Sequence, residues 1–99
     1  MTAEHFQEVN GYSNMFFGWG GEDDDLYFRI SDANLNVIRF EDVAEYKMLR
    51  HLKENPNPER FRLMNTSRHV HKFEGLNSLE YSLLAYENRP LYTWMLIKL

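Results

Sequence analysis

The stretch GWGGEDDDLYFRISD, residues 18–32, joins a glycine-rich turn to four consecutive acidic residues and an apolar pattern. Leu26 and Ile30 recur at a spacing of four, which predicts a helix from Glu22 to about Asp32. Acidic side chains in a first turn suit the positive end of the helix dipole, so a solvated acidic cap is one interpretation. The other is a reactive site on a rigid turn, where one carboxylate accepts a proton and its neighbour orients a bound hydroxyl.

The residues before this helix also admit two interpretations. Gly20 and Gly21 allow the backbone to approach a ligand closely, with N–H groups that can point outward. Trp19 stands between glycines and beside the acids, an arrangement that suits a sugar ring with apolar C–H faces and polar edges. The alternative is that Trp19 anchors the core, and the residues alone leave both possibilities open.

The composition bounds the class of protein. The 99 residues are 43% hydrophobic and 15% aromatic, enough for one folded domain over residues 1–99. A net charge of −4 argues against a nucleic-acid partner, whose binding protein is typically basic. The sequence contains no apolar run of membrane-spanning length, no secretory signal in residues 1–10 and no cysteine.

The remaining elements predict an α/β protein, in which short helices mix with small strands (α+β). A Thr2 cap predicts a helix through about Val9, closed by Gly11. The other predicted elements are strands at 36–40 and 45–49, a helix from Asn57-Pro58 to Met64 or Asn65, and a hairpin of SLEYSLLAYE (78–87) and PLYTWMLIKL (90–99). The last strand is apolar on both faces, so we expect it in the middle of a sheet or against another layer.

Met48 and His51 are candidate metal ligands. Their i, i+3 spacing could bring both side chains to one ion, although a thioether is a soft partner for Mn²⁺ and two ligands do not complete a site. The alternative places Met48 in the core and His51 on the surface. His5, His69 and His71 show no partner pattern and are expected at the surface.

Five motifs carry a resemblance to a known family, in order from about Phe6 to Tyr92. They are VNGYSNMFFGWGGEDDDLYFRI, YKMLRH, NPNPERF, EGLNSL and PLYT. The chain resembles the C-terminal part of β-1,4-galactosyltransferases, with a GT-A type fold. The resemblance implies an inverting, Mn²⁺-dependent transfer of galactose from UDP-galactose to the 4-hydroxyl of a terminal N-acetylglucosamine (GlcNAc).

The same resemblance implies a role for each motif residue. Asp23 matches the general base and Asp24 an acceptor-binding carboxylate, while Glu22 shapes the same pocket. Trp19 matches the tryptophan of a small mobile loop, with Gly20 and Gly21 supplying backbone contacts to sugar.

Further matches complete the implied site. Met48 and His51 correspond to two of three protein ligands of the metal. Arg60, Phe61 and Met64 correspond to the pocket for the acceptor's N-acetyl group, and residues 49–68 to a long loop that closes over the donor. Met64 stands where an aliphatic residue is expected.

Departures from the family pattern shape the expectations for this chain. The Asp-x-Asp motif that supplies the third metal ligand has no counterpart here, nor has the nucleotide-binding N-terminal half. Tyr46 and Lys47 stand where a cysteine is expected. The segment between His51 and Pro56, residues 52–55, is shorter than the same part of the long loop in the family. We therefore expect a fragment, inactive alone, of an enzyme anchored in the Golgi membrane with its catalytic domain in the lumen. Alternatives are a sibling that transfers GalNAc or glucose, a catalytically dead glycan-binding module, and a domain without a ligand.

Overall fold

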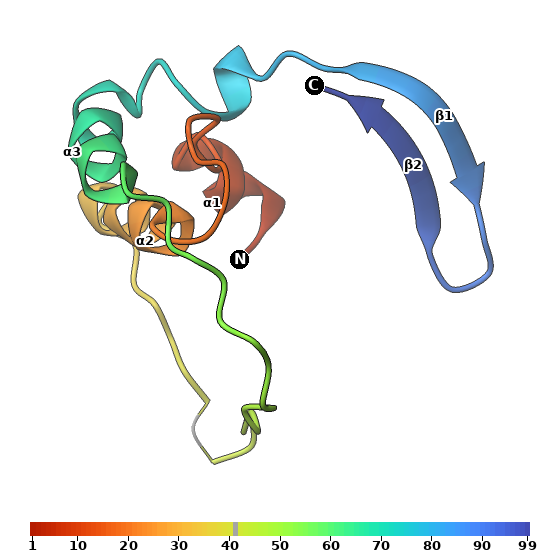
Figure 1. Cartoon of the computed structure of the whole chain (residues 1–99), viewed down its shortest axis with the longest axis horizontal. Coiled ribbons are helices and arrows are strands. Elements are labelled where there is room, and N and C mark those ends of the chain that lie inside the picture. Colours follow the sequence, from red (N-terminus) through yellow and green to blue (C-terminus); the bar gives the residue numbers. More distant parts are fainter. Residues whose placement is uncertain (41) are drawn as a thin grey trace.

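The structure is a computed structural model that describes residues 1–40 and 42–99. Its elements are α1 (Ala3–Glu8), α2 (Glu22–Asp32), α3 (Arg60–Val70), the 3₁₀ turn η1 (Leu76–Ser78), β1 (Ser82–Asn88) and β2 (Thr93–Lys98). The three helices form one body, from which a long connection and the β1–β2 hairpin project (Figure 1). The mixed α and β composition confirms the predicted fold class.

Helix α1 forms as its capping signals predict. The Thr2 hydroxyl accepts a hydrogen bond from the His5 N–H at 3.2 Å. After the helix, Gly11 takes a left-handed φ of 62° and donates its N–H to the Phe6 carbonyl at 2.8 Å. Val9 follows the helix and, at 5% exposed, is the one buried hydrophobic residue among the described residues.

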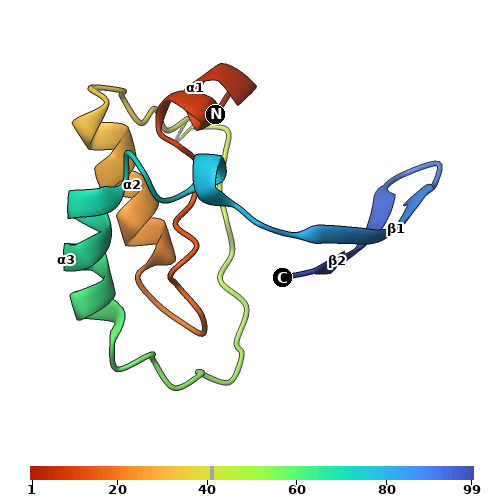
Figure 2. The ribbon, with the colours of Figure 1, turned by 90° about the horizontal axis from the view of Figure 1, so that it is seen from above.

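Helices α2 and α3 lie side by side and form the main layer of the molecule (Figure 2). The bounds predicted for α2 are confirmed at both ends. Helix α3 begins at Arg60 rather than at Pro58 and continues to Val70, beyond the predicted end at Met64 or Asn65. Its last turn carries Arg68, whose positive charge suits the helix C-terminus.

The C-terminal hairpin is confirmed as an antiparallel pair. Glu87 lies opposite Trp94 and Asn88 opposite Thr93, with an irregularity of the register between Leu83 and Ala85. The described residues form a sheet of these two strands alone, so the expected central position of the last strand is not met in this chain. Every residue of β2 is exposed, because the hairpin projects away from the helices (Figures 1 and 2).

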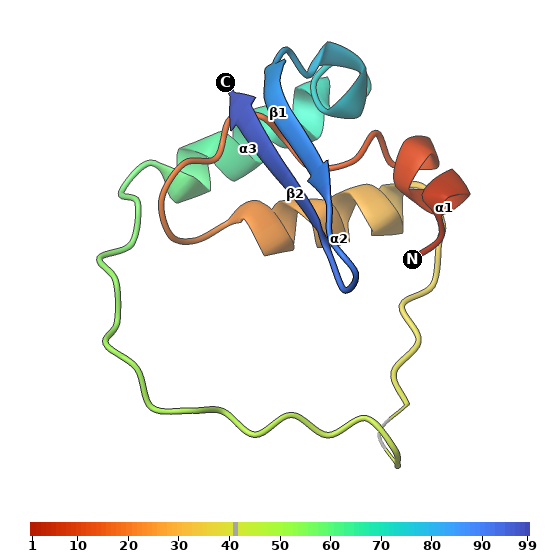
Figure 3. The same ribbon diagram turned by 90° about the vertical axis from the view of Figure 1, so that its right-hand side faces the viewer.

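The connection from α2 to α3 makes a wide arc beside the two helices (Figure 3). The strands predicted at 36–40 and 45–49 are wrong, since neither stretch forms a ladder with another strand. Their apolar side chains are exposed instead, including Ile38, Phe40 and Met48. Local β-propensity without a pairing partner does not make a strand.

The arc and the hairpin make the chain extended. Its radius of gyration is 16.0 Å, against about 13 Å for a compact domain of 100 residues. Among the described residues, no helix has both the length and the apolar character needed to cross a bilayer.

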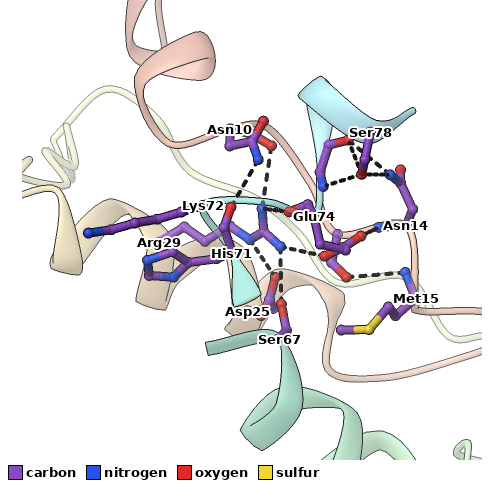
Figure 4. Close-up of polar contacts among 12 residues, drawn as sticks. Asn10, Asn14, Met15, Asp25, Arg29, Ser67, His71, Lys72, Glu74 and Ser78 are labelled. Atoms are coloured by element: carbon purple, nitrogen blue, oxygen red, sulfur yellow. Dashed lines mark hydrogen bonds and ion pairs between the residues drawn. The ribbon is translucent and has the colours of Figure 1, made fainter. Parts of the chain in front are cut away.

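A buried ionic cluster holds the helical body together (Figure 4). Arg29 of α2 and Asp25, one turn earlier, are each 2% exposed, and Ser67 of α3 is fully buried. The Arg29 guanidinium donates to Asp25 Oδ2 at 2.8 Å, Ser67 Oγ at 3.0 Å and Glu74 Oε2 at 2.9 Å. It also donates to the carbonyls of Glu74 at 2.9 Å and Asn10 at 3.3 Å. One side chain thus joins four separate segments of the chain.

Candidate functional site

The predicted sugar-contacting residues meet at one cavity of about 190 Å³. Its walls come from the glycine-rich loop, the first turn of α2 and the first half of α3. The lining residues are Trp19, Gly20, Gly21, Glu22, Asp23, Asp24, Arg60, Phe61 and Met64. All nine residues that the family motifs assign to the base and the sugar contacts therefore lie on the same hollow.

The two glycines let the loop pass close to its neighbours. Gly21, the N-cap of α2, has a left-handed φ of 100°, and a Cβ there would lie 2.9 Å from Phe16 Cε1. Gly20 has a φ of 107°, and its Cβ would lie 3.1 Å from Arg60 Cδ. Any larger residue would strain the backbone and push against Phe16 at position 21 or Arg60 at position 20.

The four acidic residues divide into two groups. Glu22, Asp23 and Asp24 are exposed at the cavity, whereas Asp25 points inward to Arg29. Asp25 is therefore not part of a solvated acidic cap, because its main partner is a buried cation. With Asp25 fixed, the first turn of α2 is anchored beneath the three carboxylates that reach solvent.

The exposed carboxylates are partly ordered by backbone N–H groups. Asp23 Oδ1 accepts from the Asp24 N–H at 3.0 Å, and Glu22 Oε2 accepts from the Gly20 N–H at 3.2 Å. The Gly20 N–H is thus occupied by Glu22, and a sugar contact there requires that carboxylate to move. The Asp24 N–H is one of the groups that a helix start leaves unpaired.

The α3 wall is an aromatic ring covered by a cation. The Arg60 guanidinium carbon lies 4.3 Å from the centroid of the Phe61 ring. Arg60 Nη1 also donates to the Asn57 carbonyl at 3.2 Å, which holds the guanidinium across the start of the helix. Phe61 remains largely exposed and Met64 half-buried, so the wall offers apolar surface beside the carboxylates.

Trp19 lies at the boundary between this cavity and a second, larger one. The larger cavity, of about 940 Å³, is lined by Trp19, residues 48–54 and Pro56. Trp19 is 54% exposed, so the interpretation that it anchors the core is wrong. Its carbonyl accepts from the Asn57 N–H at 2.9 Å, and Asn57 Nδ2 donates to the Phe17 carbonyl at 3.0 Å. The tryptophan loop is therefore tied to the end of the long connection.

Met48 and His51 both line the larger cavity. Met48 is 86% exposed, which contradicts its alternative assignment to the core. His51 Nδ1 lies 2.8 Å from the Leu52 carbonyl. Because a carbonyl only accepts hydrogen bonds, Nδ1 carries the proton and Nε2 is left as the basic nitrogen, the form that binds metals.

The two side chains fit a metal site only in part. Within residues 1–40 and 42–99, no group of three His, Cys, Asp or Glu side chains is arranged to hold an ion. The thioether is also soft for Mn²⁺. A complete site would need further ligands besides these two.

The sequence-based interpretation missed the Arg29 cluster and misplaced one histidine. The i, i+4 spacing of Asp25 and Arg29 was a usable signal for an ion pair, but Ser67 and Glu74 were not foreseeable from their local sequence. His71 was expected at the surface, yet it is half-buried, with Nδ1 at 3.9 Å from Asp32 Oδ2.

Comparisons with known proteins agree with the motifs. A family model described as the N-terminal domain of galactosyltransferase matches residues 1–52. That description differs from the C-terminal placement expected above, so the position of the chain within a whole enzyme stays a prediction.

Curated relatives extend the similarity to most of the chain. Over 97 residues it is 40% identical to β-1,4-galactosyltransferase 4 of Cricetulus griseus and 37% identical to β-1,4-galactosyltransferase 1 of Mus musculus. Each alignment covers 94% of this chain, but 28% and 24% of those proteins, respectively. The chain thus spans about a quarter of the length of these relatives.

A solved structure shares the fold. The catalytic domain of Drosophila β1,4-galactosyltransferase 7, crystallised in complex with xylobiose, superposes with a TM-score of 0.69 at 26% identity. The match covers 95% of this chain and 44% of that chain. Together, the family model, the curated relatives and the shared fold establish that the chain belongs to the β-1,4-galactosyltransferase family.

Proposed function

We propose that this protein takes part in the transfer of galactose from UDP-galactose to the 4-hydroxyl of a terminal GlcNAc. The observation that supports it is the single cavity on which all nine motif residues for the base and the sugar contacts converge. That hollow combines carboxylates with an aromatic face and an apolar wall, which suits a sugar ring.

In this proposal Asp23 is the general base. Its Oδ1 is held by the Asp24 N–H at 3.0 Å, which leaves Oδ2 for the acceptor hydroxyl. As the acceptor oxygen attacks the anomeric carbon, its proton passes to Asp23 and the bond from that carbon to the diphosphate breaks on the opposite face. The configuration at the anomeric carbon is inverted.

The neighbouring residues bind and orient the acceptor. Asp24 accepts hydrogen bonds from acceptor hydroxyls, while Trp19 stacks against a sugar face. Phe61 and Met64 provide the apolar contact for the N-acetyl methyl group, and Arg60 remains stacked on Phe61. Binding of this kind places the 4-hydroxyl beside Asp23 rather than in a random orientation.

Met48 and His51 are proposed to hold Mn²⁺ together with ligands from outside this pair. A divalent cation there would neutralise negative charge that develops on the diphosphate leaving group. His51 presents Nε2, because Nδ1 is engaged with the Leu52 carbonyl at 2.8 Å. Trp19 lines both cavities, so the metal pair and the acceptor residues share one wall.

We also propose that the protein works in the Golgi lumen, as the family resemblance implies. Its substrates there would be a sugar nucleotide and the ends of glycan chains. Fractionation of cells that express the protein at its native level, with protease protection of intact vesicles, tests this location.

The test of the activity is a chimera. The matched region of Mus musculus β-1,4-galactosyltransferase 1, aligned over 97 residues, is replaced by this chain. We expect metal-dependent transfer of galactose to GlcNAc. Asp23→Asn should lower kcat by about 10²–10⁴-fold, the usual contribution of a general base. Asp32→Asn, at the opposite end of α2, is the matched control and should leave kcat unchanged.

The choice of substrates separates the remaining possibilities. UDP-galactose, UDP-GalNAc and UDP-glucose are compared as donors, and GlcNAc and xylobiose as acceptors, since the Drosophila structure contains xylobiose. A chimera that folds but transfers no galactose to GlcNAc would contradict the proposal. A preference for another pair would identify the sibling activity instead.

A second candidate is a glycan-binding module without catalysis. Two observations favour it. All nine residues assigned to the base and the sugar contacts line one cavity of this chain, whereas its described residues contain no group of three His, Cys, Asp or Glu side chains that could hold a metal ion. Titration of the chain itself with a GlcNAc glycoside, followed by NMR, should shift the Trp19 indole signal. If the chain binds the glycoside and the chimera transfers no sugar, the glycan-binding module is favoured. We expect that the chain alone does not transfer sugar.

A further inference from the structure

Asparagine 65 begins the tripeptide Asn65-Thr66-Ser67 in the middle of α3. This pattern, asparagine followed by any residue except proline and then serine or threonine, is the acceptor signal for N-linked glycosylation. Asn65 alone among the asparagines of the chain has serine or threonine two positions later. We infer that Asn65 is an N-glycosylation site, an inference that rests on the proposed lumenal location.

The surroundings of Asn65 in the folded chain accommodate an attached glycan. Asn65 is exposed, and its amide takes part in no hydrogen bond within residues 1–40 and 42–99. It is not among the residues that line the sugar cavity. Phe61, which does line it, lies one turn earlier on the same face of α3. A glycan on Asn65 would therefore leave the helix into solvent, beside the cavity rather than inside it.

The third residue of the signal sets the timing of the modification. Ser67 is fully buried, and its hydroxyl accepts a hydrogen bond from Arg29 at 3.0 Å (Figure 4). An enzyme that must recognise this hydroxyl cannot reach it once α3 packs against α2. Glycosylation of Asn65 therefore takes place on the unfolded, newly made chain. The Ser67 hydroxyl is recognised there first, and it binds Arg29 once the chain has folded.

The reaction requires a lipid-linked oligosaccharide diphosphate as its donor. The Asn65 amide nitrogen forms a bond to the anomeric carbon of the first sugar and loses one proton. The bond from that carbon to the diphosphate oxygen breaks, and the lipid diphosphate leaves with the bonding electrons. No oxidation or reduction is involved.

The experiment places the whole chain behind a cleavable signal peptide in animal cells. Chain from which the signal peptide has been removed is isolated, treated with peptide-N-glycosidase in heavy-oxygen water, and analysed by mass spectrometry. We expect the isotopic deamidation mark at Asn65 and a faster gel mobility after treatment. Because entry into the lumen is enforced and no activity is measured, the result is independent of sugar transfer and of native location.

Matched variants make the result decisive. Asn65→Gln should remove the glycan, whereas Asn36→Gln, an exposed asparagine outside any signal, should not change it. Ser67→Thr keeps the signal and should keep the glycan. Ile38→Thr creates a second signal at Asn36 in the exposed arc, which provides a positive control. Occupancy of that control site with Asn65 unmodified in the same molecules would overturn the inference.

Discussion

Replacing Arg29 by methionine should remove a large part of the stability of the helical body. Arg29 and Asp25 are each 2% exposed, and the guanidinium is the ion-pair partner of the Asp25 carboxylate. Arg29→Met leaves that carboxylate buried without its cation, which destabilises a protein by about 3–5 kcal/mol. A domain of about 100 residues has a total stability of only about 5–15 kcal/mol. The loss is therefore a large fraction of the total and well within what unfolding measurements resolve.

The assay is urea-induced unfolding of the chain, followed by far-ultraviolet circular dichroism. In thermal unfolding, the same loss should lower Tm by roughly 12 °C or more, since each kcal/mol shifts a domain of this size by about 4–8 °C. Arg68→Met is the matched control, because Arg68 lies on α3 and pairs with Asp32 at 3.3 Å while largely exposed. Exposed pairs contribute about 0–1 kcal/mol, so the control should change little.

A double variant tests the physical reason for the loss. Asp25→Leu combined with Arg29→Met removes both charges, and should recover part of the stability that the single variant loses. If Arg29→Met proves no more destabilising than Arg68→Met, the cluster does not hold the body together. If the double variant recovers nothing, the unpaired carboxylate is not the cause.

Four further substitutions test other positions. Gly75 has a φ of 145°, and a Cβ there would lie 2.1 Å from the Asn10 carbonyl oxygen, so Gly75→Ala should prevent cooperative urea unfolding. Gly18→Ala, at a φ of 79° with open space around it, should cost only about 1–2 kcal/mol in the same measurement. The pKa of the exposed Glu4 lies below its ordinary value of 4.5, because its own backbone N–H and then the Thr2 hydroxyl bond to the carboxylate. The stability that this hydrogen-bonded carboxylate gives α1 is present above the pKa of Glu4 in the unfolded chain, and it is lost as the pH falls through the pKa in the folded chain. Thr2→Ala should raise the pKa of Glu4, which an NMR titration measures. His51→Ala in the chimera should raise the half-saturating Mn²⁺ concentration at least about tenfold, and an unchanged metal dependence would remove His51 from the proposed site.

The elements that the sequence predicts well are those with local signals. Helix α2 has its glycine N-cap, acidic first turn and apolar spacing within a few residues, and both of its ends are where they were predicted. The α1 cap at Thr2 and the C-terminal hairpin are equally local. Each of these features depends on residues that are close together in the sequence, so a sequence pattern can predict it.

The start of α3 was misplaced because Asn57 begins a turn that precedes the helix. Asn57 Oδ1 does accept from the Glu59 N–H at 2.9 Å, as a capping residue would. Its own N–H, however, bonds to the Trp19 carbonyl, and Pro56 forms a bridge with Trp19. The Arg60 N–H bonds to the Asn57 carbonyl at 3.2 Å, so residues 57–60 form a turn and the helix begins only at Arg60. Nothing in the local sequence indicates a partner so far away.

The candidate site was predicted by its motifs, while its supporting cluster was not. Asp23 and Asp24 came from a contiguous string, and the structure brings them to the same cavity as Phe61. The cluster beneath them draws on segments far apart in the chain, and its buried Ser67 resembles any helical serine in the sequence. Tertiary partners of this kind become visible only when the segments are placed in space.

The polar character of the core also determines how the chain responds to temperature. The heat capacity of unfolding increases with the apolar area that becomes hydrated and decreases with the polar area. Val9 is the one buried hydrophobic residue in the described part of the chain, and Trp94 and Ile97 are already exposed in the native state. The heat-capacity increment should therefore fall below the roughly 1.2–1.5 kcal/mol/K that is usual for a domain of 100 residues. Calorimetry should find a shallow Gibbs–Helmholtz curve, in which the free energy of unfolding changes little over a wide range of temperature.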